Sequence, residues 1–311
     1  MTDPLRPAQD APLIRTAALT KKYPRVTALD QLTMTVDRGV IGLVGANGAG
    51  KSTLIKILLG LVEPTSGTAE VLGLDAATQG PDLRRLVGYM PEHECLPPDV
   101  SATEYVVHLA RMSGLPPTAA RERTADTLRH VGLYEERYRP IGGYSTGMRQ
   151  RVKLAQALVH DPRLVFLDEP TNGLDPVGRD EMLALIRRVG ADFGISVLVA
   201  SHLLGELERT CDHVVIIDGG RLLRSSAIGA YTGRTEVLAV EVTDEPDGLV
   251  ALLDQAGLSA RRAGKLVEVR LNGHDEAYDT VRDAVARLGV GLVRLEQQRH
   301  RIEEVFTDGT P

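Results

Sequence analysis

The sequence predicts a mixed α/β protein. Its parallel-sheet core is preceded by antiparallel strands, interrupted by a helical insertion and followed by a small α+β domain. Three patterns support this. An apolar run at 40–44 leads through a glycine-rich turn into a helical pattern. Apolar runs at 164–167 and 197–200 flank a helical stretch, the strand–helix–strand order of a parallel sheet. Beyond 231 the order is β-α-β-β-α-β, typical of a ferredoxin-like domain.

The composition is that of a soluble globular protein. The chain has 311 residues, 43% of them hydrophobic and 25% charged, and a net charge of −6. No apolar stretch reaches the roughly 18 residues that span a bilayer, and the acidic balance argues against a nucleic-acid partner. Two cysteines, Cys95 and Cys211, make no disulfide or metal framework and fit a reducing, cytoplasmic location. Residues 1–12 are expected to form a flexible tail.

The segments around the glycine-rich turn predict short strands. Apolar residues between Ile14 and Leu19 and between Leu32 and Val36 flank turn residues at 23–25, which predicts antiparallel strands. After the glycine-rich turn and its helix, further strands are predicted at 68–71 and 86–90. We expect the first of these segments to form an antiparallel subdomain beside the parallel core.

The glycine-rich turn runs from Gly45 to Ser52 and reads GANGAGKS, the G-x-x-x-x-G-K-S spacing of a phosphate-binding P-loop. Gly45, Gly48 and Gly50 are expected to take φ values closed to other residues and to bring backbone N–H groups up to phosphate oxygens. The helix that begins at Lys51 directs its positive dipole end at the same anion. Lys51 would reach the β- and γ-phosphates, and the Ser52 hydroxyl would bind Mg²⁺. The sequence therefore predicts a nucleoside triphosphate site that includes Gly45, Asn47, Gly48, Gly50, Lys51, Ser52 and Thr53.

Two carboxylates follow the apolar run at 164–167. Asp168 ends this predicted strand, where it would hold Mg²⁺ near Ser52. Glu169 is one residue further along and would orient and deprotonate the attacking water. A general base of this kind is typically worth roughly 10² to 10⁴ in rate. We therefore predict nucleotide hydrolysis as well as binding.

The region between the strands at 86–90 and 164–167 has a helical pattern. A capping box from Ser101 to Glu104 predicts a helix to about Met112. A second helix is expected from about 116 to 130 and a third from near 145. These helices make up an insertion of about 92–160 within a first domain of 13–230.

The stretch from Tyr144 to Arg151, YSTGMRQR, resembles the signature loop of the ATP-binding cassette (ABC) ATPases. The resemblance spans roughly 14–223. In that family two cassettes meet head to tail, so Ser145 and Gly147 of one chain would contact the γ-phosphate of ATP held by the partner's P-loop. A helix N-terminus suits this role because it offers unpaired N–H groups and a positive dipole end.

The resemblance also implies roles for three further residues. Tyr23 would stack on adenine, and Asp175 would lie in the loop that joins the two ATP sites. His202, after the strand at 197–200, would contact the γ-phosphate. The implied cofactors are ATP and Mg²⁺, and the implied partner is a second cassette.

The chain departs from the family pattern at three positions. Thr146 and Met148 replace the common glycine and glutamine of the signature, while Ser145 and Gly147 are kept. Glu92 replaces the glutamine that reaches Mg²⁺ and the attacking water. Because a carboxylate can ligate Mg²⁺, we hypothesise that Glu92 is a metal-proximal residue that couples the helical insertion to the site.

The C-terminal domain at 231–311 closes with the segment Ile302–Phe306. It resembles the appended domain of bacterial drug- and antibiotic-export ABC subunits, which typically also carry a glutamate at the position of Glu92 and a Y-S-x-G-M signature. Three roles stay open for this domain: dimer contact, regulation or a stabilising cap.

Together these features predict an ATP-hydrolysing subunit that powers transport, preferably export, through a separate integral-membrane subunit at the cytoplasmic face. Two alternatives stay open: an importer subunit, and a cytosolic ABC ATPase that acts on ribosomes or DNA. The ribosomal type usually joins two cassettes in one chain, and the DNA type inserts a long coiled coil. This sequence shows neither feature. The cargo would be chosen by the membrane subunit.

Overall fold

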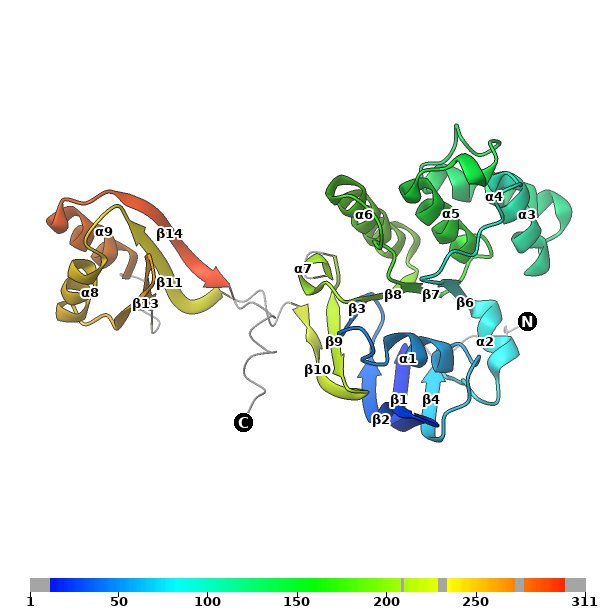
Figure 1. Ribbon diagram of the computed structural model, residues 1–311, viewed down its shortest axis with the longest axis horizontal. Helices are drawn as coiled ribbons and strands as arrows, with labels where there is room; N and C mark the ends of the chain where they lie inside the picture. The colour runs from blue at the N-terminus through cyan, green and yellow to red at the C-terminus, as the bar shows by residue number, and fades with distance from the viewer. Residues whose placement is uncertain (1–11, 208–209, 229–233, 272–276, 300–311) are drawn as a thin grey trace. The chain divides into compact units, whose positions relative to one another are not determined.

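A computed structural model describes residues 12–207, 210–228, 234–271 and 277–299. The chain divides into two compact units, Met1–Ile228 and Gly229–Pro311; the described elements of the first run from blue to yellow-green in Figure 1 and those of the second from yellow to red. Residues 1–11 of the expected tail, the expected domain boundary near 231 and the closing segment Ile302–Phe306 lie outside the described residues.

The larger unit contains a six-stranded sheet of order β10-β9-β3-β8-β7-β6. Its strands are β3 (Val40–Val44), β6 (Val87–Met90), β7 (Leu164–Asp168), β8 (Ser196–Ser201), β9 (His213–Asp218) and β10 (Arg221–Ala227). All neighbours pair in parallel except β9 and β10. Every residue of β3, β7 and β8 is buried, which explains their continuous apolar sequences. The predicted parallel core is confirmed, and β10 is an unpredicted antiparallel edge strand.

A four-stranded antiparallel sheet of order β2-β1-β4-β5 lies beside this core. Its strands are β1 (Ile14–Tyr23), β2 (Val26–Val36), β4 (Ser66–Val71) and β5 (Leu74–Asp75). Strands β1 and β2 form one continuous hairpin, longer than the predicted pieces because the ladder resumes after each register shift. Helix α1 (Lys51–Leu58) packs its buried Leu54, Ile55 and Leu58 in a core that includes residues of both sheets, and Figure 1 shows it between them.

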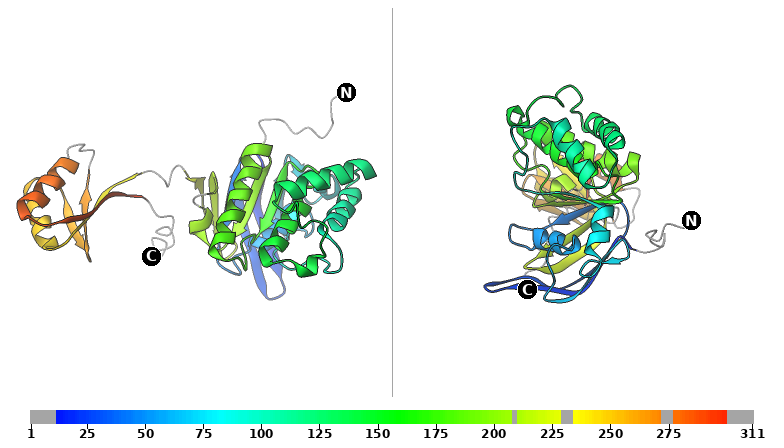
Figure 2. Two further views of the ribbon diagram at one scale, coloured as in Figure 1. Left: turned by 90° about the horizontal axis from the view of Figure 1, so that it is seen from above. Right: turned by 90° about the vertical axis from the view of Figure 1, so that its right-hand side faces the viewer.

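The helices between β6 and β7 gather at one end of the larger unit (Figures 1 and 2). They are α3 (Ala102–Met112), α4 (Pro117–His130) and α5 (Thr146–Leu158). The predicted capping box is present: the Glu104 N–H donates to Ser101 Oγ at 3.2 Å, and the Ser101 N–H donates to Glu104 Oε2 at 2.8 Å. These two bonds satisfy donors that the first turn of α3 leaves open.

Helix α6 (Pro176–Phe193) is the helical stretch predicted between the apolar runs at 164–167 and 197–200. Asp175 caps its start by accepting the Gly178 N–H at 3.1 Å, and Gly194 ends it with a left-handed φ of 64°. The short helices α2 (Gly80–Leu86) and α7 (Leu204–Leu207) were not predicted, since one or two turns carry too little periodicity.

The smaller unit is a four-stranded antiparallel sheet of order β12-β13-β11-β14. Its strands are β11 (Arg234–Val242), β12 (Ala260–Ala263), β13 (Leu266–Arg270) and β14 (Leu292–Arg299), and its helices are α8 (Pro246–Gln255) and α9 (Ala277–Leu288). Leu238, Val240 and Val267 from the sheet share a buried core with Leu249 of α8 and Val281 of α9. This element order and strand order confirm the predicted ferredoxin-like fold.

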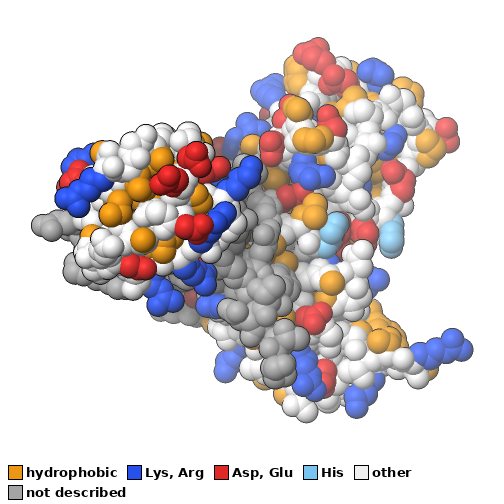
Figure 3. Space-filling view, turned by 60° about the vertical axis from the view of Figure 1, so that its left-hand side comes forward, with side chains coloured by type: hydrophobic (Ala, Val, Ile, Leu, Met, Phe, Trp, Pro, Cys, Tyr) orange, Lys and Arg blue, Asp and Glu red, His pale blue; other side chains and the backbone are white. Residues whose placement is uncertain are grey.

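Surface charges of both signs are interspersed over the face that Figure 3 shows. This distribution accompanies the modest net charge of −6. Within the described residues, no helix combines the length and the apolar character that crossing a membrane requires.

Candidate nucleotide-binding site

Four adjacent parallel strands bring six of the predicted site residues to one edge of the core sheet. The strands are β3, β8, β7 and β6, in that order. Polar side chains at the carboxyl ends of such strands line the place where ligands bind in open α/β sheets. The residues at or just beyond these ends are Lys51 and Ser52 (β3), His202 (β8), Asp168 and Glu169 (β7) and Glu92 (β6).

The P-loop joins β3 to α1, with exposed Asn47 and Gly48 at its tip. Gly48 and Gly50 have φ of 85° and 103°, a conformation open mainly to glycine. Gly45 does not share this backbone conformation, contrary to expectation. It is required for space instead, because a Cβ there would lie 2.5 Å from the carbonyl oxygen of Ile217.

The Lys51 ammonium lies within the loop, and its side chain is 7% exposed. Its Nζ donates to the Gly45 carbonyl at 2.6 Å and to the Ala46 carbonyl at 3.4 Å. The same Nζ lies 3.4 Å from Glu169 Oε1. The cation is therefore held where phosphate oxygens entering the loop would meet it. Thr53, in the first turn of α1, is half-buried.

The carboxylate of Glu169 contacts two residues, Lys51 at the start of α1 and His202 just after β8. While Oε1 faces Lys51, Oε2 lies 3.0 Å from His202 Nδ1. The backbone of Glu169 has a left-handed φ of 51°, which is strained for a residue with a side chain. Two hydrogen bonds hold this conformation: the Glu169 N–H donates to the Ala200 carbonyl at 2.9 Å, and the Asn172 N–H donates to the Glu169 carbonyl at 3.1 Å. The strained backbone thus aims the carboxylate at Lys51 and His202.

Asp168 is buried, with 2% of its surface exposed. Among the described residues, its Oδ1 has no hydrogen-bond partner. Burial raises the pKa of this carboxyl, a hydrogen bond with Ser52 lowers it, and the nearby Glu92 and Glu169 carboxylates raise it further. An orphaned carboxylate oxygen beside a serine hydroxyl and a second carboxylate is a donor set that suits Mg²⁺. The residues present therefore fit the implied metal.

Tyr23 stands apart from this group. It is the last residue of β1, in the antiparallel sheet, and is 41% exposed. The Lys21 ammonium lies 5.2 Å from the centre of its ring. The ring is thus accessible for stacking, with a cation beside it.

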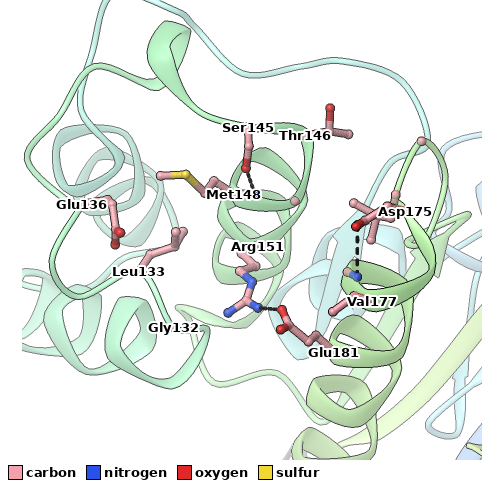
Figure 4. Close-up of a pocket in the computed structure, with 14 residues that line it drawn as sticks. Gly132, Leu133, Glu136, Ser145, Thr146, Met148, Arg151, Asp175, Val177 and Glu181 are labelled. Atoms are coloured by element: carbon pink, nitrogen blue, oxygen red, sulfur yellow. Dashed lines mark hydrogen bonds and ion pairs between the residues drawn. The ribbon is translucent and has the colours of Figure 1, made fainter.

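Ser145, Gly147 and Asp175 come together in a second place, a pocket of about 620 Å³ at the N-terminal ends of α5 and α6. Ser145 caps α5 by accepting the Met148 N–H at 3.3 Å. Figure 4 shows Ser145 and Asp175 on opposite sides of this pocket, with Arg151 below Ser145. Two helix N-termini therefore open into the same space, which favours an anion.

An ion pair between α5 and α6 is part of the lining of this pocket. Nη2 of Arg151 lies 2.7 Å from Oε2 of Glu181 (Figure 4). The described residues that line the pocket fall within 132–151 and 173–181, and the P-loop is not among them. The signature residues and Asp175 therefore line a different place in the chain from the P-loop.

Two polar contacts of α5 were missed from the sequence. Gln150 donates through Nε2 to the Asn172 carbonyl at 3.1 Å, and Lys153 donates through Nζ to the Glu92 carbonyl at 3.0 Å. Both side chains are buried. The available signal was their position on the helix beside apolar residues such as Val152 and Ala155.

The fold and the P-loop define a nucleoside triphosphatase of the P-loop class. Residues 29–172 match the family model described as ABC transporter. The chain is 31% identical to the bacitracin transport ATP-binding protein BcrA of Bacillus licheniformis, over 94% of its own length and 96% of that protein. The chain therefore belongs to the ABC transporter family and is an ATP-binding ATPase, as the signature loop had predicted.

Two further proteins extend this comparison. The daunorubicin/doxorubicin resistance ATP-binding protein DrrA of Streptomyces peucetius is 36% identical over 70% of this chain and 66% of its own length. The structure of cbiO1 from Clostridium perfringens, part of the ABC transporter complex cbiONQ, superposes with a TM-score of 0.65 at 28% identity. That match covers 71% of this chain and 90% of cbiO1.

Proposed function

We propose that the chain is the ATP-hydrolysing subunit of an exporter and acts with a separate integral-membrane subunit at the cytoplasmic face of the cell membrane. Its similarity to proteins named for bacitracin transport and for drug resistance supports export. Import and a cytosolic, non-transport role are the alternatives. The C-terminal unit, 231–311, would be an accessory domain.

The geometry around Glu169 supports its role as the catalytic base. Its carboxylate lies between Lys51 and His202, so a water near it would also lie near the cation that binds the γ-phosphate. Lys51 and His202 would stabilise negative charge on the transferred phosphoryl group. Ser52 and Asp168, with Glu92 nearby, would hold Mg²⁺, which neutralises phosphate charge when bound.

The observation that carries the proposal is the separation of the Ser145 pocket from the P-loop. The pocket of Ser145 and Asp175 is formed by α5, α6 and their flanking loops without the P-loop, so a single chain would contact its bound ATP through the P-loop group alone. In a head-to-tail pair of cassettes, the Ser145 pocket of each chain would face the P-loop of the other. The pair would therefore form two complete ATP sites. ATP would then act as a clamp between subunits, and its hydrolysis would let them separate. The insertion at 92–160 would pass this motion to the membrane subunit.

Capture from native membranes tests this proposal. A tagged Glu169→Gln protein, incubated with Mg²⁺ and ATP, should retain an integral-membrane protein together with a second cassette. Lys51→Ala is the matched control, because it removes the phosphate-binding cation and should lose the cassette pairing. Recovery of ribosomal proteins or DNA in place of a membrane protein would contradict the proposal.

The direction of transport needs a separate measurement. Cells that carry the Lys51→Ala protein should become more sensitive to at least one compound of a panel of antibiotics and cytotoxic drugs. Exporter loss raises intracellular drug, whereas importer loss leaves sensitivity unchanged or lowers it. Unchanged growth on the whole panel, combined with loss of uptake of a nutrient, would favour the importer alternative.

A further inference from the structure

Lys153 is a buried lysine in the middle of α5, the helix that begins at Ser145. Only 3% of its surface is exposed. Lysine is rarely buried to this extent unless its charge is compensated. Neither the P-loop chemistry nor the signature pocket uses this side chain, so its burial needs another explanation.

The groups around Lys153 are mostly acidic, and all of those named below except Asp168 belong to the segment that follows β6. Its Nζ donates to the main-chain carbonyl of Glu92 at 3.0 Å. Burial lowers the pKa of the ammonium, while Cys95, Glu94, Glu92 and Asp168 raise it. Glu94 also lies 3.7 Å from Arg149 Nε.

This position links three parts of the molecule. The ammonium comes from α5, its hydrogen-bond acceptor is on the segment after β6, and it interacts electrostatically with Asp168 at the end of β7. Asp168 in turn interacts with the Glu92 carboxylate. Lys51 of the P-loop lowers the pKa of Asp168, and Asp168 is among the groups that raise the pKa of Lys153.

We infer that Lys153 is a positioning residue that holds the backbone of Glu92 in place, so that the Glu92 carboxylate can serve the proposed Mg²⁺ site. Its hydrogen bond fixes the main chain of Glu92, and its buried charge opposes that of the acidic groups around it. The helix that presents Ser145 to a partner's ATP is thereby tied to the metal site of its own chain. This inference rests on the proposed metal-proximal role of Glu92.

The inference is tested by nucleotide binding, without turnover. The affinity of a fluorescent ATP analogue is measured in EDTA and over a Mg²⁺ titration. Removing a residue that orients a metal ligand typically costs about 10- to 100-fold in metal affinity. Lys153→Met should therefore raise the half-effective Mg²⁺ concentration at least about tenfold, while the affinity in EDTA stays unchanged. Lys265→Met, the same change at an exposed lysine, should leave both values unchanged.

A double-mutant cycle separates positioning from packing. If Lys153 acts through Glu92, then Lys153→Met should shift the Mg²⁺ midpoint far less in a Glu92→Ala background, where residue 92 has no oxygen to offer the metal. Lys153→Arg should keep most of the wild-type Mg²⁺ response because it keeps the charge. Lys153→Gln, a second uncharged variant, should reproduce the shift of Lys153→Met.

Four results would overturn the inference. Equal losses of affinity in EDTA and in Mg²⁺ would indicate a packing role, and additive effects of Lys153→Met and Glu92→Ala would exclude action through Glu92. An unchanged Mg²⁺ midpoint in both uncharged variants would exclude any role at the metal. If the wild-type protein itself showed no gain from Mg²⁺, the proposed metal site would be wrong as well.

Discussion

The Glu169 carboxylate lies 3.0 Å from Nδ1 of His202, the residue that follows the neighbouring strand β8. Its second oxygen lies 3.4 Å from the Lys51 ammonium. One buried carboxylate therefore touches both groups that would meet the γ-phosphate. Because Glu169 is held between them by a strained backbone and two main-chain hydrogen bonds, its position is set before ATP binds.

Replacing Glu169 by glutamine should separate binding from hydrolysis. The amide has the same shape and cannot accept a proton from water, so phosphate release should fall roughly 10²- to 10⁴-fold. ATP affinity should not fall, because the neutral amide no longer competes with phosphate oxygens for the Lys51 ammonium. Phosphate release and ATP-induced dimerisation by size exclusion measure the two effects. Glu135→Gln, at an exposed site, is the control, and turnover by Glu169→Gln at the wild-type rate would refute the assignment.

An arginine at position 145 should block pairing of cassettes. Ser145 faces the pocket between the N-terminal ends of α5 and α6, and the long side chain of Ser145→Arg would fill the space expected for the partner's phosphate. Nucleotide binding to the single chain should persist, because the P-loop does not line this pocket. Dimerisation is measured in the Glu169→Gln background with ATP, and Ser259→Arg, an exposed position in the smaller unit, is the control. A Ser145→Arg protein that still dimerised would exclude composite sites.

Removing the ring of Tyr23 should weaken nucleotide binding. Stacking of a base on an aromatic ring is worth about 1–3 kcal/mol, so Tyr23→Ala should lower ATP affinity about tenfold, while Tyr23→Phe should keep it. Tyr138→Ala removes an exposed ring from the helical insertion and serves as the control. Equal ATP affinity of Tyr23→Ala and the wild-type protein would remove Tyr23 from the site.

The fold could be predicted where the sequence carries long or uninterrupted patterns. The apolar runs of β3 and β7 and the capping box of α3 each point to one structure. The elements that were missed give weaker signals. Strand β10 is a half-exposed edge, so its mixed sequence RLLRSSA shows no clear alternation. Helix α7 spans only Leu204–Leu207.

The candidate site could be predicted as motifs, but the contacts within it could not. The spacing of the P-loop identifies Lys51, and the acidic end of an apolar strand identifies Glu169. Their contact depends on the order β3-β8-β7, which sequence separation does not reveal. The hydrogen bond from Lys153 to Glu92 likewise joins elements far apart in the chain. The reason for glycine at position 45 is also hidden in the sequence, because it became clear only when the Ile217 carbonyl was found to leave no room for a Cβ.

Acid should destabilise the larger unit partly through His160. Its Nε2 lies 3.0 Å from the Val87 carbonyl, which suits a neutral ring that donates its N–H. Burial lowers the pKa of His160 from the ordinary 6.5, against smaller opposing effects of that carbonyl and of Asp161. The folded state therefore binds this proton less readily than the unfolded state. The contribution of His160 to stability is then complete above pH 6.5 and is lost as pH falls below it.

The thermal unfolding midpoint between pH 7.5 and about pH 5.5 measures this loss. The midpoint of His160→Gln should fall less than that of the wild-type protein, because its uncharged amide can still donate to Val87 and gains no proton on unfolding. Some slope should remain, since burial also lowers the pKa of His213. His108→Gln, at an exposed site on α3, should keep the wild-type slope. If His160→Gln and His108→Gln gave the same slope, burial of a neutral His160 would not be a source of acid sensitivity.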